Sequence, residues 1–439
     1  MILKDNLNMM CFFRKVFFIS FIVLFSPFVQ SELTIDITKG VEAAVPLAVA
    51  PFGWQASIPA APVNLSEIIS SDLSRSGLFK TLSEGDMLTQ PKAGDTVNFR
   101  NWRALGQEYL LIGLIDEVMG QYEVKFQLFD VFKGSAILGY RLTVKKNELR
   151  KTAHHISDVV YEKLTGKKGV FSSRIAYITT SKVGSKKRKL YKLLVADADG
   201  FNPRPIASSW EPLMSPAWSP DGNEIAYVSF ENKRSAIYIQ RLADGNRRKV
   251  ASFRGINGAP SFSPDGSKLA LTLSKEGSPD IYILNLKDQK LIRMTKSYAI
   301  DTEPSWSPDG KTIVYTSNRG GKPQLYTVSS QGGRSSRLTF NGDYNARGQF
   351  SSDGRSIAMV HANRGDYRIA VMDLATQTVN VLTAGKNDES PSFSSNGDMV
   401  LYAAKKGRQS VLSAVSTDGR MQQSFTFDSG DVREPAWSH

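Results

Sequence analysis

The stretch Trp218-Ser-Pro-Asp-Gly222 is repeated through the second half of the chain and decides its fold. Each copy starts with an aromatic residue followed by Ser, and the copies start at Trp218, Phe262, Trp306, Phe350, Phe393 and Trp437. Successive aromatic residues lie 44, 44, 44, 43 and 44 positions apart. A fixed period of this size is typical of a β-propeller, in which each repeat supplies a four-stranded blade.

The turn chemistry of the motif places it between the first two strands of a blade, because Ser-Pro-Asp-Gly suits a type I turn. Six second strands are expected to begin near Ile175, Ile225, Leu269, Ile313, Ile357 and Val400. First strands begin only at Ala217, and the last one is Ala436-Trp437-Ser438. We therefore expect the C-terminal strand to complete the blade opened by Arg174–Ile178. This pairing closes the ring and removes its open sheet edge.

The region before the propeller has a different pattern. Strand-like runs occur at 33–37, 46–52, 109–115, 122–132 and 135–145. Asn64, with Glu67 three residues later, is expected to cap one helix, and Asn147 a second helix that ends at Gly166. The sequence thus predicts an α+β N-terminal domain over 32–168, with an arm over 32–45, followed by an all-β six-bladed propeller over 169–439.

Residues 1–31 have the features of a secretory signal peptide. Lys4, Arg14 and Lys15 form a basic region ahead of the apolar run Val16–Phe25, and cleavage is expected after Ser31. An uncleaved anchor helix is the alternative, but the run is short for the ~20 residues of a membrane span. The one cysteine, Cys11, precedes the apolar run, so the exported chain has no disulfide framework and no acylation site.

Motifs that carry catalytic chemistry are missing from the sequence. There is no Gly-x-Ser-x-Gly nucleophile elbow and no phosphate-binding loop. The histidines, His154, His155, His361 and His439, have no spacing typical of metal ligands. The formal charge is +13, but the basic run 185–189 has no aromatic stacking platform around it. We expect no enzyme, cofactor, metal ion or nucleic acid.

The loops that precede the first strands are expected to surround the mouth of the central channel. They are residues 210–215, 255–259, 300–303, 341–347, 387–389 and 432–434. In these loops Leu213, Met214 and Ile256 are expected to be exposed beside four acids, which are Asp301, Glu303, Glu389 and Glu434. Apolar anchors with an acidic rim suit a protein partner that carries basic groups. Ordinary loop composition is the alternative interpretation.

Taken together, these features resemble the TolB family of the Tol–Pal envelope system. The match rests on Pro212–Gly222, on Asn257–Pro260 before Phe262–Gly266, on Thr302–Pro304 and on Pro435–Ser438. Residues 32–40 followed by 46–52 resemble the mature N-terminus of the family. The resemblance covers essentially all of residues 32–439.

The resemblance implies a periplasmic, monomeric, non-catalytic protein that links the outer-membrane lipoprotein Pal to the inner-membrane protein TolA. It further implies roles in outer-membrane integrity and in invagination during cell division, with other envelope proteins as further partners. The Pal-contact residues it implies are Met214, Ile256, Asn257, Ala259, Thr302 and Glu303. The TolA-contact residues it implies are Glu32, Leu33, Thr34, Ile35, Asp36, Ile37, Thr38, Lys39 and Gly40.

Several alternatives stay open at the level of sequence. The run at Leu33, Ile35 and Ile37 could belong to an arm that adds a strand to a partner, or it could be a fixed strand of the N-terminal domain. A periplasmic propeller enzyme of the lactonase or lyase type would need a metal or an acid–base cluster in the channel. A propeller subunit of an outer-membrane assembly complex would bind barrel-insertion proteins instead of Pal.

Overall fold

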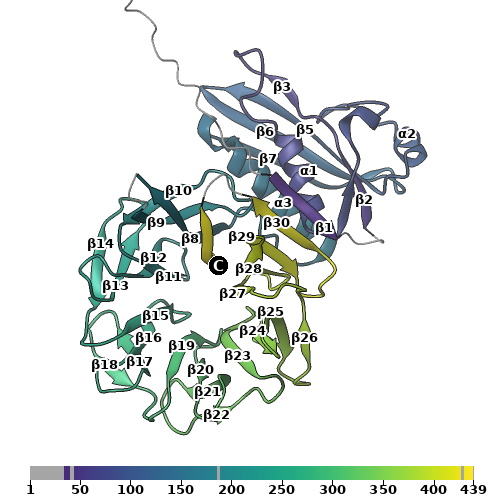
Figure 1. The fold of residues 1–439 in the computed structure, drawn as a ribbon. Helices are drawn as coiled ribbons and strands as arrows, with labels where there is room; N and C mark the ends of the chain where they lie inside the picture. The colour runs from purple at the N-terminus through teal and green to yellow at the C-terminus, as the bar shows by residue number, and fades with distance from the viewer. Residues whose placement is uncertain (1–33, 40–43, 185–187, 427–429, 439) are drawn as a thin grey trace, which may run out of the picture. The chain divides into compact units, whose positions relative to one another are not determined.

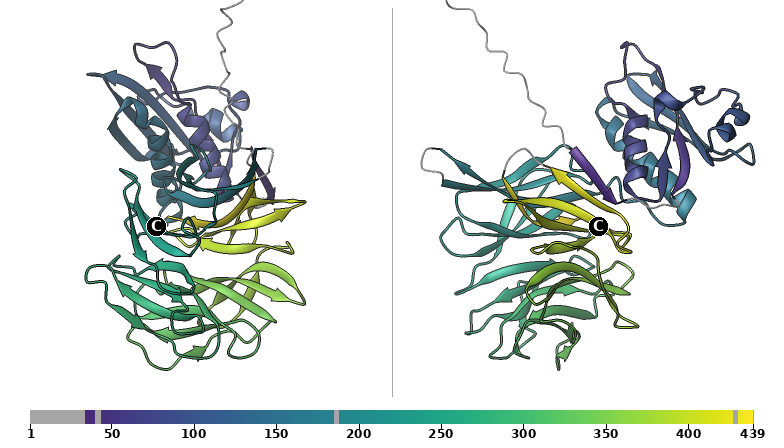
Figure 2. Two further views of the ribbon diagram at one scale, coloured as in Figure 1. Left: turned by 60° about the vertical axis from the view of Figure 1, so that its left-hand side comes forward. Right: turned by 45° about the vertical axis from the view of Figure 1, so that its right-hand side comes forward.

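The structure is a computed structural model that describes residues 34–39, 44–184, 188–426 and 430–438. The predicted signal peptide and residues 32–33, 40 and 185–187 lie outside the described residues. The described chain forms an α+β part followed by a six-bladed β-propeller, as predicted (Figure 1; further views in Figure 2). None of its helices is long and apolar enough to cross a membrane.

The α+β part is built on one mixed sheet with the strand order β4-β2-β5-β6-β7, to which β3 adds by pairing with β5. Strands β2, β3 and β4 run parallel to their neighbours, whereas β5, β6 and β7 form an antiparallel meander. The strands are β2 (Val45–Val49), β3 (Gly53–Gln55), β4 (Phe79–Thr81), β5 (Tyr109–Val118), β6 (Gln121–Asp130) and β7 (Ser135–Val144).

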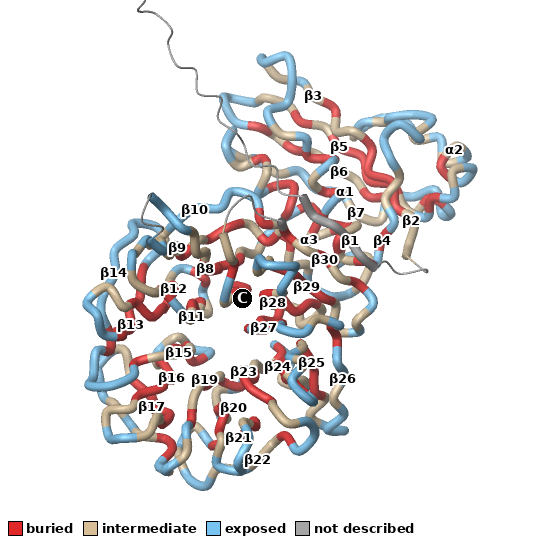
Figure 3. Tube along the Cα trace, viewed as in Figure 1, coloured by how far each residue is buried: buried red, intermediate tan, exposed pale blue. Residues whose placement is uncertain are grey.

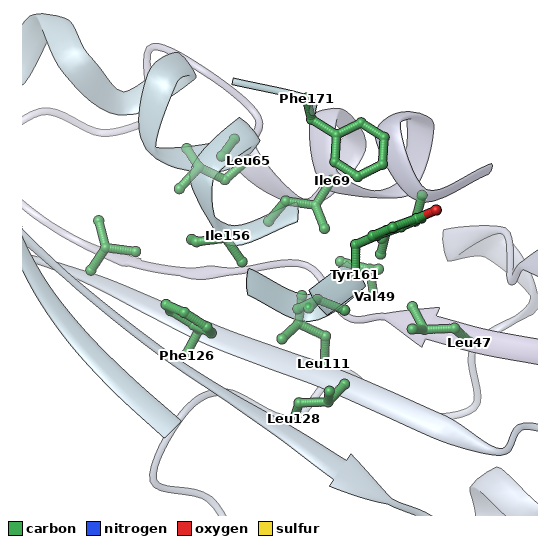
Figure 4. Packing of buried hydrophobic residues seen from close by; sticks show 14 of the residues in the cluster. Leu47, Val49, Leu65, Ile69, Leu111, Phe126, Leu128, Ile156, Tyr161 and Phe171 are labelled. Carbon is green, nitrogen blue, oxygen red and sulfur yellow. The ribbon is translucent and has the colours of Figure 1, made fainter. Parts of the chain in front are cut away.

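Helices α1 (Leu65–Arg75) and α3 (Leu149–Thr165) pack against each other and against this sheet, while α2 (Phe99–Ala104) is a short helix ahead of β5. Two single 3₁₀ turns, η1 (Glu84–Asp86) and η2 (Lys146–Glu148), complete the part. Ile69 and Ile156, from α1 and α3, meet Leu111 and Phe126 of the sheet in one buried cluster (Figure 4). Burial of this apolar surface is what holds the helices on the sheet.

The helix caps follow the prediction in one case and differ in the other. The side chain of Asn64 accepts a hydrogen bond from the Glu67 amide, so the first predicted cap is confirmed. The predicted Asn147 cap is wrong, because Asn147 lies inside η2 and α3 starts two residues later, with Glu148 at its N-cap. Glu148 instead accepts a bond from the Lys145 amide. Gly166 ends α3 in a left-handed conformation, as expected.

Each blade of the propeller is a four-stranded antiparallel meander. Blade 1 contains β8 (Arg174–Val183), β9 (Arg188–Asp197), β10 (Arg204–Ser209) and β31 (Asp431–Trp437). Blade 2 contains β11 (Leu213–Trp218), β12 (Glu224–Ser229), β13 (Ala236–Arg241) and β14 (Arg247–Ala251). Blade 3 contains β15 (Asn257–Phe262), β16 (Lys268–Leu273), β17 (Asp280–Asn285) and β18 (Leu291–Arg293).

The remaining blades repeat this arrangement. Blade 4 contains β19 (Asp301–Trp306), β20 (Thr312–Ser317), β21 (Gln324–Ser329) and β22 (Ser336–Arg337). Blade 5 contains β23 (Tyr344–Phe350), β24 (Ser356–Asn363), β25 (Asp366–Asp373) and β26 (Val379–Val381). Blade 6 contains β27 (Glu389–Phe393), β28 (Met399–Lys406), β29 (Gln409–Ser416) and β30 (Gln422–Thr426). In Figure 3 the buried residues follow the strands, and many of the loops between them are exposed.

The C-terminal strand closes the ring as predicted. β31 pairs antiparallel with β8, the first propeller strand in the chain. The indole Nε1 of Trp437 donates to Ser173 Oγ at 2.7 Å, and the Ser438 amide donates to the Arg174 carbonyl at 2.8 Å. The two ends of the propeller are thus joined by hydrogen bonds and packing alone.

The N-terminal strand β1 (Thr34–Lys39) pairs antiparallel with β30 and becomes the fifth strand of blade 6. It makes no pairing with the α+β sheet. The alternative in which this run is a fixed strand of the N-terminal domain is therefore wrong. β1 is an added edge strand on the propeller.

The first strands begin earlier than the sequence indicated. In blade 2 the strand starts at Leu213 instead of Ala217, so Met214 lies in the strand instead of in a loop. The register with the second strand shifts between Met214 and Ala217, where Ser215 has a left-handed backbone with φ of 50°. This bulge allows pairing to continue beyond the irregular residue. The same extension occurs in every blade, and it moves part of each predicted mouth loop onto a strand, although Ile256 stays in the loop before β15.

Candidate protein-binding face of the propeller

One left-handed residue stands at the same place in every first strand and faces the central channel. Its φ lies between 45° and 57°, although none of the six residues is glycine. A non-glycine residue in this conformation costs on the order of 1 kcal/mol, so the surrounding sheet must hold it in place. The six residues form what we call the channel ring: Ser215, Ala259, Glu303, Arg347, Ser390 and Glu434. They line a channel of about 410 Å³.

Arg347 links its neighbours across the channel ring. Its Nε lies 2.8 Å from Glu303 Oε1, and its Nη2 lies 3.9 Å from Glu434 Oε1. Its Nη1 donates to Ser390 Oγ, so one guanidinium contacts three other blades. The Glu434 carboxylate also accepts a hydrogen bond from the Ser215 amide. The charged side chains therefore restrict the channel at its mouth.

The electrostatics of the channel ring keep Arg347 charged. Burial by itself lowers the pKa of the Arg347 guanidinium, but Glu303, Glu434 and Glu389 outweigh that effect and raise the pKa overall. Its side chain is still one third exposed, so water screens these charges in part. The ring behaves as a partly solvated ion-pair network.

A groove lies at the mouth, beside the channel ring, between blades 2 and 3. It has a volume of about 770 Å³ and contains Met214, Ile256 and Asn257, three of the predicted contact residues. Met214 and Ile256 are 38% and 51% exposed, as predicted. Asn257 is buried, because its side-chain amide donates to the carbonyls of Phe253 and Gly255. Its side chain therefore shapes the loop that carries Ile256.

The other predicted contact residues lie elsewhere. Ala259 and Glu303 belong to the channel ring, and Thr302 lies in β19 opposite Thr316. Of the nine residues predicted to bind TolA, 34–39 form β1, and Glu32, Leu33 and Gly40 lie outside the described residues. The structure thus brings the propeller residues together in two neighbouring places and separates them from β1.

The expected acidic rim is wrong for three of its four acids. Asp301 is fully buried and pairs with Arg319 at 2.5 Å, and Glu303 pairs with Arg347. Glu434 is bound within the channel ring. Leu213, expected to be exposed, is also buried. The reason is that the first strands start early and turn these side chains inward.

A set of large exposed aromatic side chains in the loops before the first strands was not predicted from the sequence. Phe253, Tyr298 and Phe340 stand three or four residues before the first strands of blades 3, 4 and 5, as Trp210 does in blade 2. All of these aromatic rings are more than one third exposed. Their common offset from the next first strand is the signal that could have found them. With Met214, Ile256 and Ile300 they add exposed apolar surface in and next to the loops that lead into the first strands.

The described residues contain one cluster with the composition of a metal site, away from the channel. It consists of Asp72 on α1, His154 on α3 and Asp199 after β9. His154 Nδ1 lies 2.7 Å from Asp72 Oδ2, and its Nε2 lies 3.8 Å from Asp199 Oδ2. The two carboxylates already pair with Arg75 and Arg150. A metal ion would have to displace these cations, so the donor set does not fit one.

This cluster acts as a buried ion-pair network. Burial by itself raises the pKa of Asp72, but Arg75 and His154 outweigh it and hold the pKa below its usual value. Asp72 therefore stays ionised at neutral pH. Its spacing of 82 residues from His154 explains why sequence reasoning did not connect them.

Comparisons with known proteins agree with this architecture. Residues 33–137 match the TolB amino-terminal domain family, and residues 161–439 match the TolB β-propeller domain family. The chain is 62% identical over 421 residues to the Tol-Pal system protein TolB of Methylococcus capsulatus, covering 96% of this chain and 97% of that protein. It is 59% identical over 414 residues to the same protein of Nitrosococcus oceani, covering 94% and 95%.

A solved structure gives the same result in three dimensions. The crystal structure of TolB from Acinetobacter baumannii superposes with a TM-score of 0.85 at 42% identity, and the match covers 93% of this chain and 100% of that one. Both domain families, the nearly full-length sequence matches and the common fold agree. The chain therefore belongs to the TolB family of the Tol–Pal system.

Proposed function

We propose that this protein is a non-enzymatic periplasmic linker that binds Pal at the mouth of the propeller and TolA through its N-terminal arm. In this role it serves outer-membrane integrity and invagination during cell division. Membership of the Tol–Pal family supports the proposal, as does the predicted export signal. The observation that carries it is the apolar mouth, where Met214 and Ile256 lie exposed beside a charge-restricted channel.

The mouth suits a protein partner better than a small substrate. Exposed aromatic and aliphatic side chains around a concave centre are typical of the buried core of a protein interface. In the proposed Pal site, Met214 and Ile256 make the apolar contact, and Asn257 holds the loop that carries Ile256. Ala259, Thr302 and Glu303 complete the site toward the channel.

The arm suits strand addition. β1 pairs antiparallel with β30 at the edge of blade 6, so an equivalent strand edge on TolA can compete for it. Residues 34–39 then have two alternatives, docked on blade 6 or bound to TolA. Pal can influence this choice only if its affinity differs between the docked and the released states.

Calorimetric titration of residues 32–439 with the periplasmic domain of Pal tests the mouth. We expect 1:1 binding that Ile256→Asp weakens about tenfold or more, because a buried carboxylate replaces an apolar anchor. Ile292→Asp on β18 is the matched control, since Ile292 is 48% exposed but lies far along the blade from the mouth. If Pal binds the two variants with equal affinity, the Pal site does not include Ile256 and lies elsewhere on the protein.

Deletion of residues 32–40 tests the arm. We expect the truncated chain to lose TolA binding in a pull-down while its titration with Pal still gives a 1:1 complex. The two measurements separate loss of the arm from loss of the fold. If TolA still binds the truncated chain, the proposal that TolA binds through the arm is contradicted.

A further inference from the structure

The groove at the mouth has a charge opposite to the one that the loop sequences indicated. It is lined by Lys233, Arg234 and Arg254, together with Met214 and Ile256, and no carboxylate is among its lining residues. Two of the acids expected at the mouth, Glu303 and Glu434, line the channel instead, where Arg347 binds both. The mouth thus has acids paired with Arg347 at its centre and a basic groove at its side.

Two of the three cations in the groove are free to bind a partner. Lys233 Nζ pairs with Glu211 at 2.5 Å. Arg234 and Arg254 are exposed, and within the described part of the chain no carboxylate lies within ion-pair distance of either guanidinium. Guanidinium groups present several donors in a planar fork that matches a carboxylate.

The groove is also held in shape before any partner arrives. The Ile256 amide donates to Ser274 Oγ at 2.7 Å, and the Phe253 amide donates to Asn257 Oδ1 at 2.7 Å. Gly255 has a φ of 84°, and a Cβ there would lie 2.4 Å from Ser274 Oγ, so only glycine fits. A preformed site loses less conformational entropy on binding.

We propose that this groove receives an acidic segment of the partner protein, in which a carboxylate binds Arg234 and Arg254 and a neighbouring apolar side chain packs on Met214 and Ile256. The inference rests on the proposed binding of Pal at the mouth and adds the chemistry of the segment that Pal must present. Charge complementarity favours this occupant, because two unpaired guanidiniums flank exposed apolar side chains and, among the described residues, no acid lines the groove.

Titration with the periplasmic domain of Pal at 50 and 500 mM NaCl tests the proposal. We expect Arg254→Glu to weaken binding at least about tenfold at low salt, and the double variant with Arg234→Glu to weaken it further. The affinity of the unchanged chain falls as salt rises, because the ions screen the pairs, and the double variant loses this dependence. Both arginines are exposed, so the fold is kept, and thermal unfolding checks it.

Lys311→Glu is the matched control. Lys311 is exposed in the tight turn at the other end of blade 4, so the variant makes the same charge change away from the mouth. It should change the affinity by less than about threefold, as for a distant, screened charge. If Arg254→Glu changes neither the affinity nor its salt dependence, the proposal that an acidic segment binds in the groove is contradicted, whereas the proposal that Pal binds at the mouth is kept. If the unchanged chain does not bind Pal, the proposed function itself fails, and self-association through the groove would identify a second copy as its occupant.

Discussion

The first strand of each blade has a mouth end, which carries the channel ring, and a turn end, where the aromatic-Ser motif begins. What repeats from blade to blade differs between these two ends. At the turn end the sequence repeats, because a serine hydroxyl donates to the side chain two residues later at 2.5–2.8 Å in five blades. The same hydroxyl accepts the amide of the next strand at 2.9–3.0 Å. The pairs are Ser219–Asp221, Ser263–Asp265, Ser307–Asp309, Ser351–Asp353 and Ser394–Asn396. Side-chain chemistry makes this turn, so substitution is restricted.

At the mouth end the backbone conformation is the same in every blade, whereas the side chains differ. All six residues of the channel ring are left-handed, yet they are serine, alanine, glutamate or arginine. The sheet on both sides forces the conformation, so the side chain is free to vary. We infer from this contrast that the turn end maintains the fold, whereas the mouth end is available for recognition. The following predictions test this division, from the largest expected effect on stability to the smallest.

Removal of residues 431–439 should have the largest effect, because it opens the ring at the one junction that both ends share. Trp437 is 6% exposed, and loss of a buried tryptophan side chain alone costs about 3–5 kcal/mol. We expect the cooperative unfolding transition of the propeller to be lost in urea denaturation followed by circular dichroism. Deletion of His439 alone leaves β31 whole and serves as control. A wild-type unfolding curve for the longer deletion would mean that β31 does not close the ring.

Arg347→Met should destabilise the propeller by about 1–2 kcal/mol, since it leaves the Glu303 and Glu434 carboxylates facing each other in a partly solvated site. Urea denaturation measures the change. In the double variant with Glu303→Gln, part of the loss should be recovered, because one of the two unpaired carboxylates is gone. Strictly additive effects of the two substitutions would show that the pair is not coupled.

Ser263→Ala at the turn end should cost about 1 kcal/mol, because a buried hydroxyl with two hydrogen bonds is lost. Pal affinity should stay within about twofold in the same titration, because the turn is at the opposite end from the mouth. Ser267→Ala is the control. It removes an exposed hydroxyl bonded to the same carboxylate and should cost less. A large loss of Pal binding in Ser263→Ala would contradict the inference that only the mouth end of the first strands serves recognition.

The smallest effect is the pH dependence of the Ser263→Ala penalty. The hydrogen bonds from Ser263 and Ser267 lower the pKa of Asp265 below its usual value. A lowered pKa contributes stability above the unfolded value of about 3.9 and loses it as the pH falls through the folded value. We therefore expect the difference between the wild type and Ser263→Ala to shrink between pH 5 and 3. A constant difference would show that Asp265 is not involved.

Much of the fold could be predicted from local chemistry. The 44-residue period predicted six blades, and the second strands begin within one residue of their expected positions. The predicted pairing of the C-terminal strand with β8 is confirmed. The start of each first strand was missed, because a left-handed Ser215 or Glu303 has no sequence signal. The Asn147 cap was missed because the preceding η2 turn shifted the start of α3.

The candidate site was predicted less well than the fold. The expected exposure of Met214 and Ile256 is confirmed, although Met214 lies in β11 and only Ile256 lies in a loop. The charge of the mouth could not be predicted, because it depends on which acids form ion pairs with arginines of the folded propeller. Asp301 meets Arg319 within its own blade, whereas Glu303 meets Arg347 from the next blade.

The propeller, its closure and its repeated turn can all be inferred from the sequence alone. These features depend on hydrogen bonds within a few residues and on a fixed spacing, both of which are visible in one dimension. Which charges of the mouth remain free, and where β1 pairs, depends on contacts that form only in the folded chain. Ring closure brings residues 303, 347 and 434 into contact across three blades, whereas Arg234 and Arg254 in the groove have no ion pair within the described part of the chain.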